Sequence, residues 1–111
     1  MDLRAFHRDV LRTIRPDVPK RDRLIIGALG LSGETGEVVD SLKKMLFQDH
    51  PLEKQTICDE LGDVLWYMVL LCDTMGLTLE DVMSYNVEKR RKRYPDGFSP
   101  ERSLNRENEA R

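Results

Sequence analysis

Two features of the sequence predict an all-α protein. Charged residues make up 34% of the chain and hydrophobic residues 40%, a mixture that suits amphipathic helices with one apolar face. Runs in which Val, Ile or Thr alternate with polar residues are nearly absent, so the period of two that marks β-strands is missing. With 111 residues the chain has room for one core. We therefore expect one helical domain over residues 1–98 and a loosely ordered C-terminal tail over residues 99–111.

Helical periodicity divides this domain into four segments, of which residues 3–14 are the first. Leu3, Phe6, Val10 and Ile14 fall on one stripe of this segment, and two prolines follow it. The pattern predicts a short amphipathic helix that buries one face.

The other three segments follow at short intervals. Residues 22–47 form the second, and "QDHP" turns the chain into the third, residues 52–75, which Gly76 ends. The fourth, residues 79–93, is broken by "YPDGFSPERS". Because the second and third helices are joined by a short turn, we expect them to pack antiparallel.

The second segment contains four glycines spaced three apart, in "GALGLSGETGEVVD". Each costs about 1 kcal/mol relative to alanine inside a helix, so close approach of another helix or access for a ligand must compensate. A Walker-type phosphate loop is a poor alternative because no Lys-Ser/Thr pair follows the glycines. A dinucleotide-binding fingerprint fails as well, since no strand precedes it. The helix interpretation is preferred.

Two pairs of carboxylates carry the candidate chemistry. Glu34 and Glu37 are three residues apart on the second helix, and Glu60 and Asp63 have the same spacing on the third. Residues at this spacing point the same way, and each pair borders the apolar stripe of its helix. We therefore expect these four side chains, here called the acidic cluster, to approach the seam between the two helices.

Four carboxylates at such a seam would repel one another and lose hydration unless a cation joined them. Oxygen ligands select hard ions, so we expect Mg²⁺, with Mn²⁺ as the second choice. A solvated acidic helix face is the alternative. A ferritin-like di-iron site is disfavoured because it needs Glu-x-x-His, and neither His7 nor His50 follows a glutamate at that spacing.

The fourth helix offers groups that suit a polyphosphate. Asn86, Lys89 and Arg93 share one face, and cationic side chains beside a metal site commonly hold phosphate oxygens. A solvated basic helix end, favoured by the helix macrodipole, explains the neighbouring residues 90–92 equally well.

The composition and charge of the chain indicate in which compartment it works and which partners are unlikely. The formal net charge of −2 makes nucleic acid an unlikely partner. Charges interrupt the N-terminus where a signal peptide would be apolar, and "VLWYMVLLC" is far shorter than the roughly 20 residues that span a bilayer. Cys58 and Cys72 lie in apolar stretches without metal-binding spacing, which predicts buried, reduced thiols. We expect a cytoplasmic protein without membrane contact.

Three stretches together resemble the MazG-like family of all-α nucleoside triphosphate pyrophosphohydrolases: "GETGEVVDSLKK", "DELGDVLWYMVLL" and "NVEKRRKRYPDGF". The resemblance covers about residues 24–98. It implies a four-helix-bundle-type MazG-like fold completed by oligomerisation, with Mg²⁺ held by the acidic cluster. It also implies Mg²⁺-dependent hydrolysis of a nucleoside triphosphate to the monophosphate and pyrophosphate. House-cleaning of the nucleotide pool is the expected role, and control of a signalling nucleotide pool is the alternative.

The same resemblance assigns roles to single residues. Many relatives have a second glutamate directly before the first ligand, whereas this chain has Gly33, which leaves the identity of the general base open. Our own candidate for the base is Glu37, with Glu34 beside it. The residues implied to bind the substrate are Asn86, Lys89, Arg93, Tyr94 and Phe98, together with Lys43 or Lys44, of which we select Lys44.

Oligomerisation is also expected from the third helix, which is apolar on nearly all sides. Trp66, Val69 and Leu70 lie off the main stripe, and so short a chain cannot easily bury them alone. A homodimer or homotetramer would cover them. The alternative functions are a non-catalytic helical protein-interaction module and, less favoured, a nucleic-acid-binding module that uses "EKRRKRY".

Overall fold

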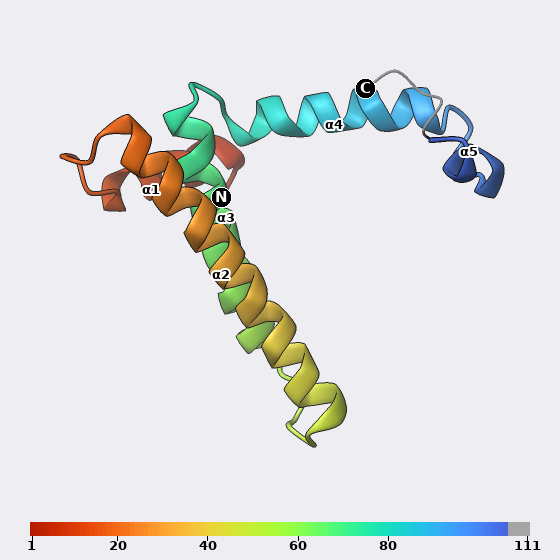
Figure 1. Ribbon diagram of the computed structural model, residues 1–111, viewed down its shortest axis with the longest axis horizontal. Helices are drawn as coiled ribbons and strands as arrows, with labels where there is room; N and C mark the ends of the chain where they lie inside the picture. The colour runs from red at the N-terminus through yellow and green to blue at the C-terminus, as the bar shows by residue number, and fades with distance from the viewer. Residues whose placement is uncertain (107–111) are drawn as a thin grey trace. The chain divides into compact units, whose positions relative to one another are not determined.

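The computed structural model describes residues 1–106, and every regular element in that range is a helix (Figure 1). The predicted all-α class is confirmed. The helices are α1 (Leu3–Thr13), α2 (Lys20–Phe47), α3 (Lys54–Thr74), α4 (Leu79–Arg93) and α5 (Pro100–Leu104).

Contacts divide the chain into two compact units, Met1–Leu79 and Glu80–Arg111. The first unit holds α1, α2 and α3, and the second holds nearly all of α4 together with α5. The single domain over residues 1–98 stays a prediction, because the described contacts place α4 in one unit with α5.

The first helix, α1, begins where its sequence supplies a cap. The Oδ1 atom of Asp2 accepts a hydrogen bond from the backbone N–H of Ala5 at 2.8 Å, which satisfies one of the unpaired amides of the first turn. Beyond Thr13 the backbone becomes extended, and a proline at position 16 comes next, as expected.

The hydrophobic core lies where α1 packs on the C-terminal half of α3. Its buried members are Val10, Val69, Cys72 and Leu79. Partly buried side chains surround them, namely Leu3, Phe6, Ile14, Trp66 and Met68. The apolar stripe expected on α1 is therefore the face that α1 buries. The expectation that a partner chain must cover Val69 and Leu70 is wrong, because both are buried within the single chain.

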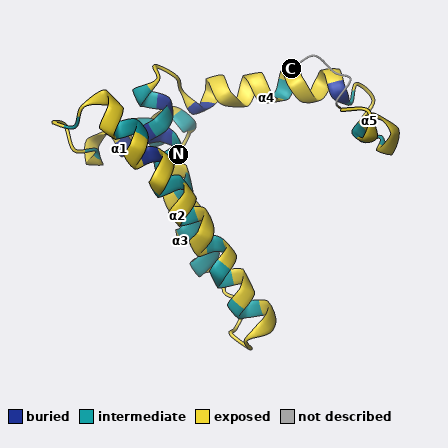
Figure 2. Ribbon diagram, viewed as in Figure 1, coloured by how far each residue is buried: buried dark blue, intermediate teal, exposed yellow. Residues whose placement is uncertain are grey.

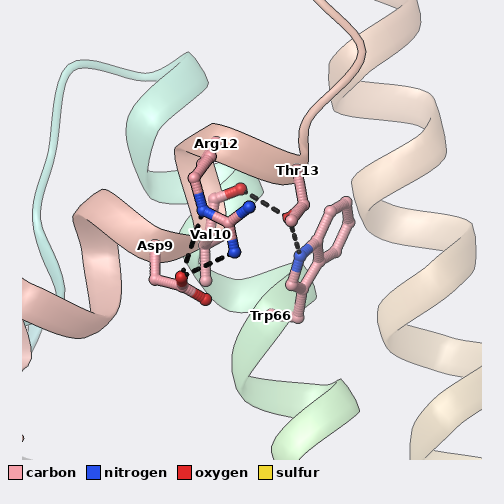
Figure 3. Close-up of polar contacts among 5 residues, drawn as sticks. All are labelled: Asp9, Val10, Arg12, Thr13 and Trp66. Atoms are coloured by element: carbon pink, nitrogen blue, oxygen red, sulfur yellow. Dashed lines mark hydrogen bonds and ion pairs between the residues drawn. The ribbon is translucent and has the colours of Figure 1, made fainter.

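A hydrogen bond between side chains locks α1 to α3 at the edge of this core (Figure 3). The indole N–H of Trp66 donates to the Oγ1 atom of Thr13 at 2.8 Å, and the Thr13 hydroxyl donates to the carbonyl of Val10 at 2.7 Å. Each polar atom in this chain of bonds thus has a partner.

Helices α2 and α3 form a long antiparallel hairpin, as predicted (Figure 1). Two glycines let the backbones approach. A Cβ atom on Gly30 would lie 2.0 Å from the Tyr67 ring, and one on Gly27 would lie 2.6 Å from the Leu71 side chain. Close approach of a neighbouring helix is therefore the reason for these two glycines.

The hairpin turn is short and tight. The backbone N–H groups of Gln48 and His50 both donate to the carbonyl of Lys44, and Asp49 adopts a left-handed conformation with φ 56°. Aspartate is one of the few residues that tolerate this region.

Burial falls off from the core toward the hairpin turn (Figure 2). Leu46 and Phe47, next to the turn, are exposed. Cys72 is buried as predicted, but the prediction for Cys58 is wrong, because that thiol is exposed near the N-terminus of α3. The apolar character of α3 did not reveal which end of the helix the core covers.

The second unit contains a helix that sequence reasoning did not anticipate. Ser99 caps α5 by accepting a hydrogen bond from the N–H of Arg102, and Pro100 occupies the first turn, where its missing N–H costs nothing. The end of the predicted tail, residues 107–111, lies outside the described residues.

Among residues 1–106, no single helix is both long and apolar enough to cross a membrane; α3 and α4 meet that test of length and composition only when taken together.

Candidate active site

The four carboxylates of the acidic cluster come from facing stretches of α2 and α3. Glu34 and Glu37 lie in the middle of α2, and Glu60 and Asp63 lie in the N-terminal half of α3. Because the two helices run antiparallel, these stretches lie opposite one another.

The pKa of Glu34 is affected by the other carboxylates of this cluster. Its pKa is raised above the usual 4.5, first by loss of hydration and then by the negative charges of Asp63, Glu37 and Glu60. Carboxylates influence one another in this way only at short range. Glu34 is therefore close enough to the other three carboxylates to feel their charge.

The cluster is not drawn together to the distances of a metal shell. In the described part of the chain, no three Asp, Glu, His or Cys side chains are arranged so that they could hold an ion as they stand. Assignment of Glu34, Glu37, Glu60 and Asp63 as ligands stays a prediction.

Glu60 is the member of the cluster with the most defined surroundings. Its Oε1 atom accepts a hydrogen bond from the Ser41 hydroxyl at 2.5 Å, across the seam between α3 and α2. Its Oε2 atom is buried and has no hydrogen-bond partner. A buried carboxylate oxygen without a partner is costly, and a hard cation is the kind of group that it would accept. The residues present therefore fit a divalent ion.

A second pattern of charges borders the cluster on α2. The Lys44 ammonium lies 2.9 Å from Oδ2 of Asp40, and Lys43 lies 3.4 Å from Oδ1. The hydrogen bond from Lys44 is the main reason that the pKa of Asp40 is lowered. The pKa of Lys44 is raised, chiefly by its bond to Asp40 and further by the charges of Glu37 and Glu60.

Lys44 thus lies beside the acidic cluster. Sequence reasoning named Lys44 but not Asp40 or Ser41. The signal for both was present: Asp40 precedes Lys44 by four residues, and Ser41 follows Glu37 by four, so each pair shares a helix face.

The predicted substrate residues other than Lys44 lie in the unit that begins at Glu80. On α4, the Nε atom of Arg90 donates to the Oδ1 atom of Asn86 at 2.8 Å. Lys89 is exposed, whereas Arg93 has only 7% of its surface exposed. The Lys89 side chain is therefore open to solvent, whereas Arg93 is held within the protein.

Two aromatic rings follow α4 and face each other across a glycine turn. The ring centroids of Tyr94 and Phe98 are 5.6 Å apart with an interplanar angle of 42°. Gly97, at φ 92°, turns the chain between them in a conformation that other residues rarely adopt. Phe98 is exposed and Tyr94 is partly buried, so the aromatic pair is open to solvent mainly at Phe98.

Comparison with protein families matches residues 27–98 to the MazG nucleotide pyrophosphohydrolase domain. This chain belongs to the MazG family. The matched range includes the whole acidic cluster and the candidate substrate residues on α4 and after it. The predicted resemblance is confirmed, and the general chemistry of the MazG domain is nucleotide pyrophosphate hydrolysis that depends on a divalent metal.

Two curated relatives are similar to this MazG domain. Gene 37 protein of Mycobacterium phage L5 is 34% identical over 73 residues, which cover 62% of this chain and 64% of the phage protein. Uncharacterized protein YvdC of Bacillus subtilis (strain 168) is 43% identical over 42 residues, covering 38% of this chain and 40% of that protein. The chain therefore matches less than two thirds of either relative. No solved structure matches it.

Proposed function

We propose that this MazG domain hydrolyses a nucleoside triphosphate to the monophosphate and pyrophosphate in a reaction that depends on Mg²⁺, with Mn²⁺ as a substitute. The observation that carries the proposal is the buried Oε2 atom of Glu60, which has no hydrogen-bond partner and lies at the seam where α2 and α3 bring acidic side chains together. A buried carboxylate oxygen without a partner is unfavourable, and a cationic ligand would relieve that cost.

The acidic cluster would hold the metal. Its four members supply oxygen ligands only, which suits Mg²⁺, and the unpartnered Oε2 atom of Glu60 supplies a ready position. When bound, a divalent ion would neutralise charge on the phosphoryl oxygens and make a water molecule more acidic.

The proton of the attacking water needs an acceptor from the chain. Gly33 occupies the position before Glu34, so no further carboxylate is available there. Glu37 is the proposed base, because it is exposed and lies within the electrostatic reach of both Glu34 and Lys44. Glu34 would orient the water together with Glu37.

Cationic side chains would bind the phosphates. Lys44 has three N–H donors and uses one on Asp40, so others remain for a phosphate oxygen. Lys89 and Arg93 are the proposed contacts from α4, and Asn86 would face the sugar or the phosphates. Tyr94 and Phe98 would stack on the base, since stacking on aromatic rings tolerates several bases.

A second copy of the chain is part of this proposal. Large apolar side chains of α2 and α3 are exposed in the single chain, among them Leu29, Val39, Leu61 and Leu65. A homodimer or homotetramer would remove this surface from water and complete a four-helix bundle. House-cleaning of the nucleotide pool in the cytoplasm is the proposed role.

Replacement of single carboxylates tests the catalytic proposal. Glu60→Gln and Asp63→Asn should each lower Mg²⁺-dependent release of pyrophosphate by about 100-fold or more. Each variant would hold the metal less well, so the charge that develops in the transition state would be less stabilised. Asp59→Asn is the matched control: this carboxylate is exposed on α3 beside Glu60, and its loss should leave the rate unchanged. Full activity in both cluster variants would refute the ligand assignment.

Thermal unfolding separates the enzyme from a non-catalytic interaction module. For the enzyme, Mg²⁺ with a nucleoside triphosphate should raise the melting temperature through binding to the folded state. An interaction module predicts no such shift. Neutralising a cluster carboxylate should stabilise the metal-free fold in either case, but for an interaction module it should have no effect on nucleotide binding.

A further inference from the structure

Ser41 is a residue of the α2–α3 seam to which the proposed reaction gives no role. It lies on α2, four residues after Glu37, and its side chain crosses to α3. The Ser41 hydroxyl donates to the Oε1 atom of Glu60 at 2.5 Å. This bond joins the two helices through polar side chains at the level of the acidic cluster.

The two oxygens of Glu60 therefore differ. Oε1 is engaged by the Ser41 hydroxyl, whereas Oε2 is buried without a partner. A carboxylate bound in this way has a fixed orientation about its terminal torsion, which is otherwise broad. Its unengaged oxygen is the one that remains for a cation.

We propose that Ser41 is a positioning residue that makes Glu60 a one-oxygen metal ligand through Oε2, and so favours Mg²⁺ over Ca²⁺. The inference rests on the proposed function. Mg²⁺ demands an octahedral shell of single oxygens, whereas Ca²⁺ accepts six to eight ligands and commonly takes carboxylates through both oxygens. With one lone pair of Oε1 committed to the hydroxyl and the carboxylate turned accordingly, the two-oxygen mode that suits Ca²⁺ is disfavoured.

Loss of the hydroxyl should have two consequences. Glu60 would turn more freely, so binding of a small octahedral ion should weaken by about 10-fold, as is usual when a group that orients a ligand is removed. Oε1 would also become available, so Ca²⁺ affinity should fall less or rise. The ratio of the two affinities is the quantity that Ser41 controls.

The test measures metal binding and does not depend on turnover. Mn²⁺ binding to the full chain is followed by electron paramagnetic resonance, and Mg²⁺ and Ca²⁺ are each titrated as competitors. Ser41→Ala should weaken Mn²⁺ and Mg²⁺ binding by about 10-fold and reduce the preference for Mg²⁺ over Ca²⁺. Ser41→Thr keeps the hydroxyl and should restore both. Ser32→Ala is the matched control, because Ser32 is exposed on the opposite face of α2 and should leave binding unchanged.

A double-mutant cycle removes a general structural effect. In a Glu60→Ala background, Ser41→Ala should cause no further change in ion binding, since its only proposed action is through Glu60. Alanine is a good helix former, so the variants should fold, and circular dichroism checks this.

The contradictory outcomes are distinct. Wild-type protein that binds Mn²⁺, with Ser41→Ala binding it equally well, would overturn this inference and leave the proposed function standing. An equal loss of Mg²⁺ and Ca²⁺ in Ser41→Ala would overturn the selectivity. Wild-type protein that binds no Mn²⁺ would overturn the proposed function and this inference with it.

Discussion

Two stretches of α2 contain glycines at the same spacing in different surroundings. In the N-terminal stretch, Gly27 and Gly30 lie against α3 so closely that a Cβ atom would collide with Leu71 or Tyr67. In the middle stretch, Gly33 and Gly36 have no neighbouring atom within 4 Å of the position of a Cβ. The spacing of three is identical, yet only the first pair is explained by packing inside the chain.

The middle stretch of α2, whose glycines are not explained by packing, also carries the proposed chemistry. Glu34 and Glu37 alternate with the two open glycines, and the side chains across the seam are acidic. The N-terminal stretch is opposed by apolar and aromatic side chains of α3. Stability is therefore concentrated toward the core end of the hairpin, while repulsion is concentrated toward the turn.

Gly30→Ala should give the largest change in stability along α2. The new Cβ would lie 2.0 Å from the Tyr67 ring, so the helices must separate or the ring must move, at a cost of about 1–3 kcal/mol. Urea unfolding followed by circular dichroism measures it. Gly62→Ala on α3, where no atom lies within 4 Å, is the control and should not destabilise the protein.

Gly33→Ala and Gly36→Ala should have the opposite sign. Each removes the entropic cost of a helical glycine and meets no neighbour, so the free energy of unfolding should rise by about 0.5–1 kcal/mol per site. Urea unfolding at several protein concentrations checks this. Destabilisation that depends on concentration would instead show that a second chain packs closely against these glycines.

Glu34→Gln should give the smallest effect, with a defined pH dependence. Below about pH 4.5, the usual pKa, the carboxyl is protonated in both states and costs nothing. As the pH rises, the unfolded chain ionises first, so the protein loses stability until the pH exceeds the raised folded-state pKa. The variant lacks this loss and should be the more stable protein above that pH.

Thermal unfolding of both proteins between about pH 4 and pH 8 measures this difference, which should close at the acidic end. Millimolar Mg²⁺ should stabilise the wild type at neutral pH and narrow the gap. If the wild type were the more stable at neutral pH without metal, the repulsion within the acidic cluster would have to be compensated by other groups.

Helix positions were largely predictable because they depend on local chemistry. Proline, glycine and apolar periodicity placed α1 to α4 within a few residues of their observed bounds. The short helix α5 was missed although Ser99 and Pro100 form a standard start signal. The prolines and the glycine in residues 94–100 predicted a loop at this point. A helix of five residues is too short to show the apolar periodicity that would have indicated a helix instead.

Side-chain partners were less predictable because they depend on register between helices. Cys58 and Cys72 share an apolar helix, yet one is exposed and one is buried. The bond from Ser41 to Glu60 joins residues 19 apart in the chain, and a helical pattern alone does not place a serine opposite a glutamate.

The order of residues was enough to establish the all-α class, the antiparallel hairpin and the family, since each depends on periodicity and spacing within a short stretch. The packing of α2 on α3 was needed to separate the closely packed glycines from the open ones and to couple Glu34 to its neighbours. It also distinguished the two oxygens of Glu60. These features depend on distances between segments, and such distances arise only when the helices come together and exclude water from the seam.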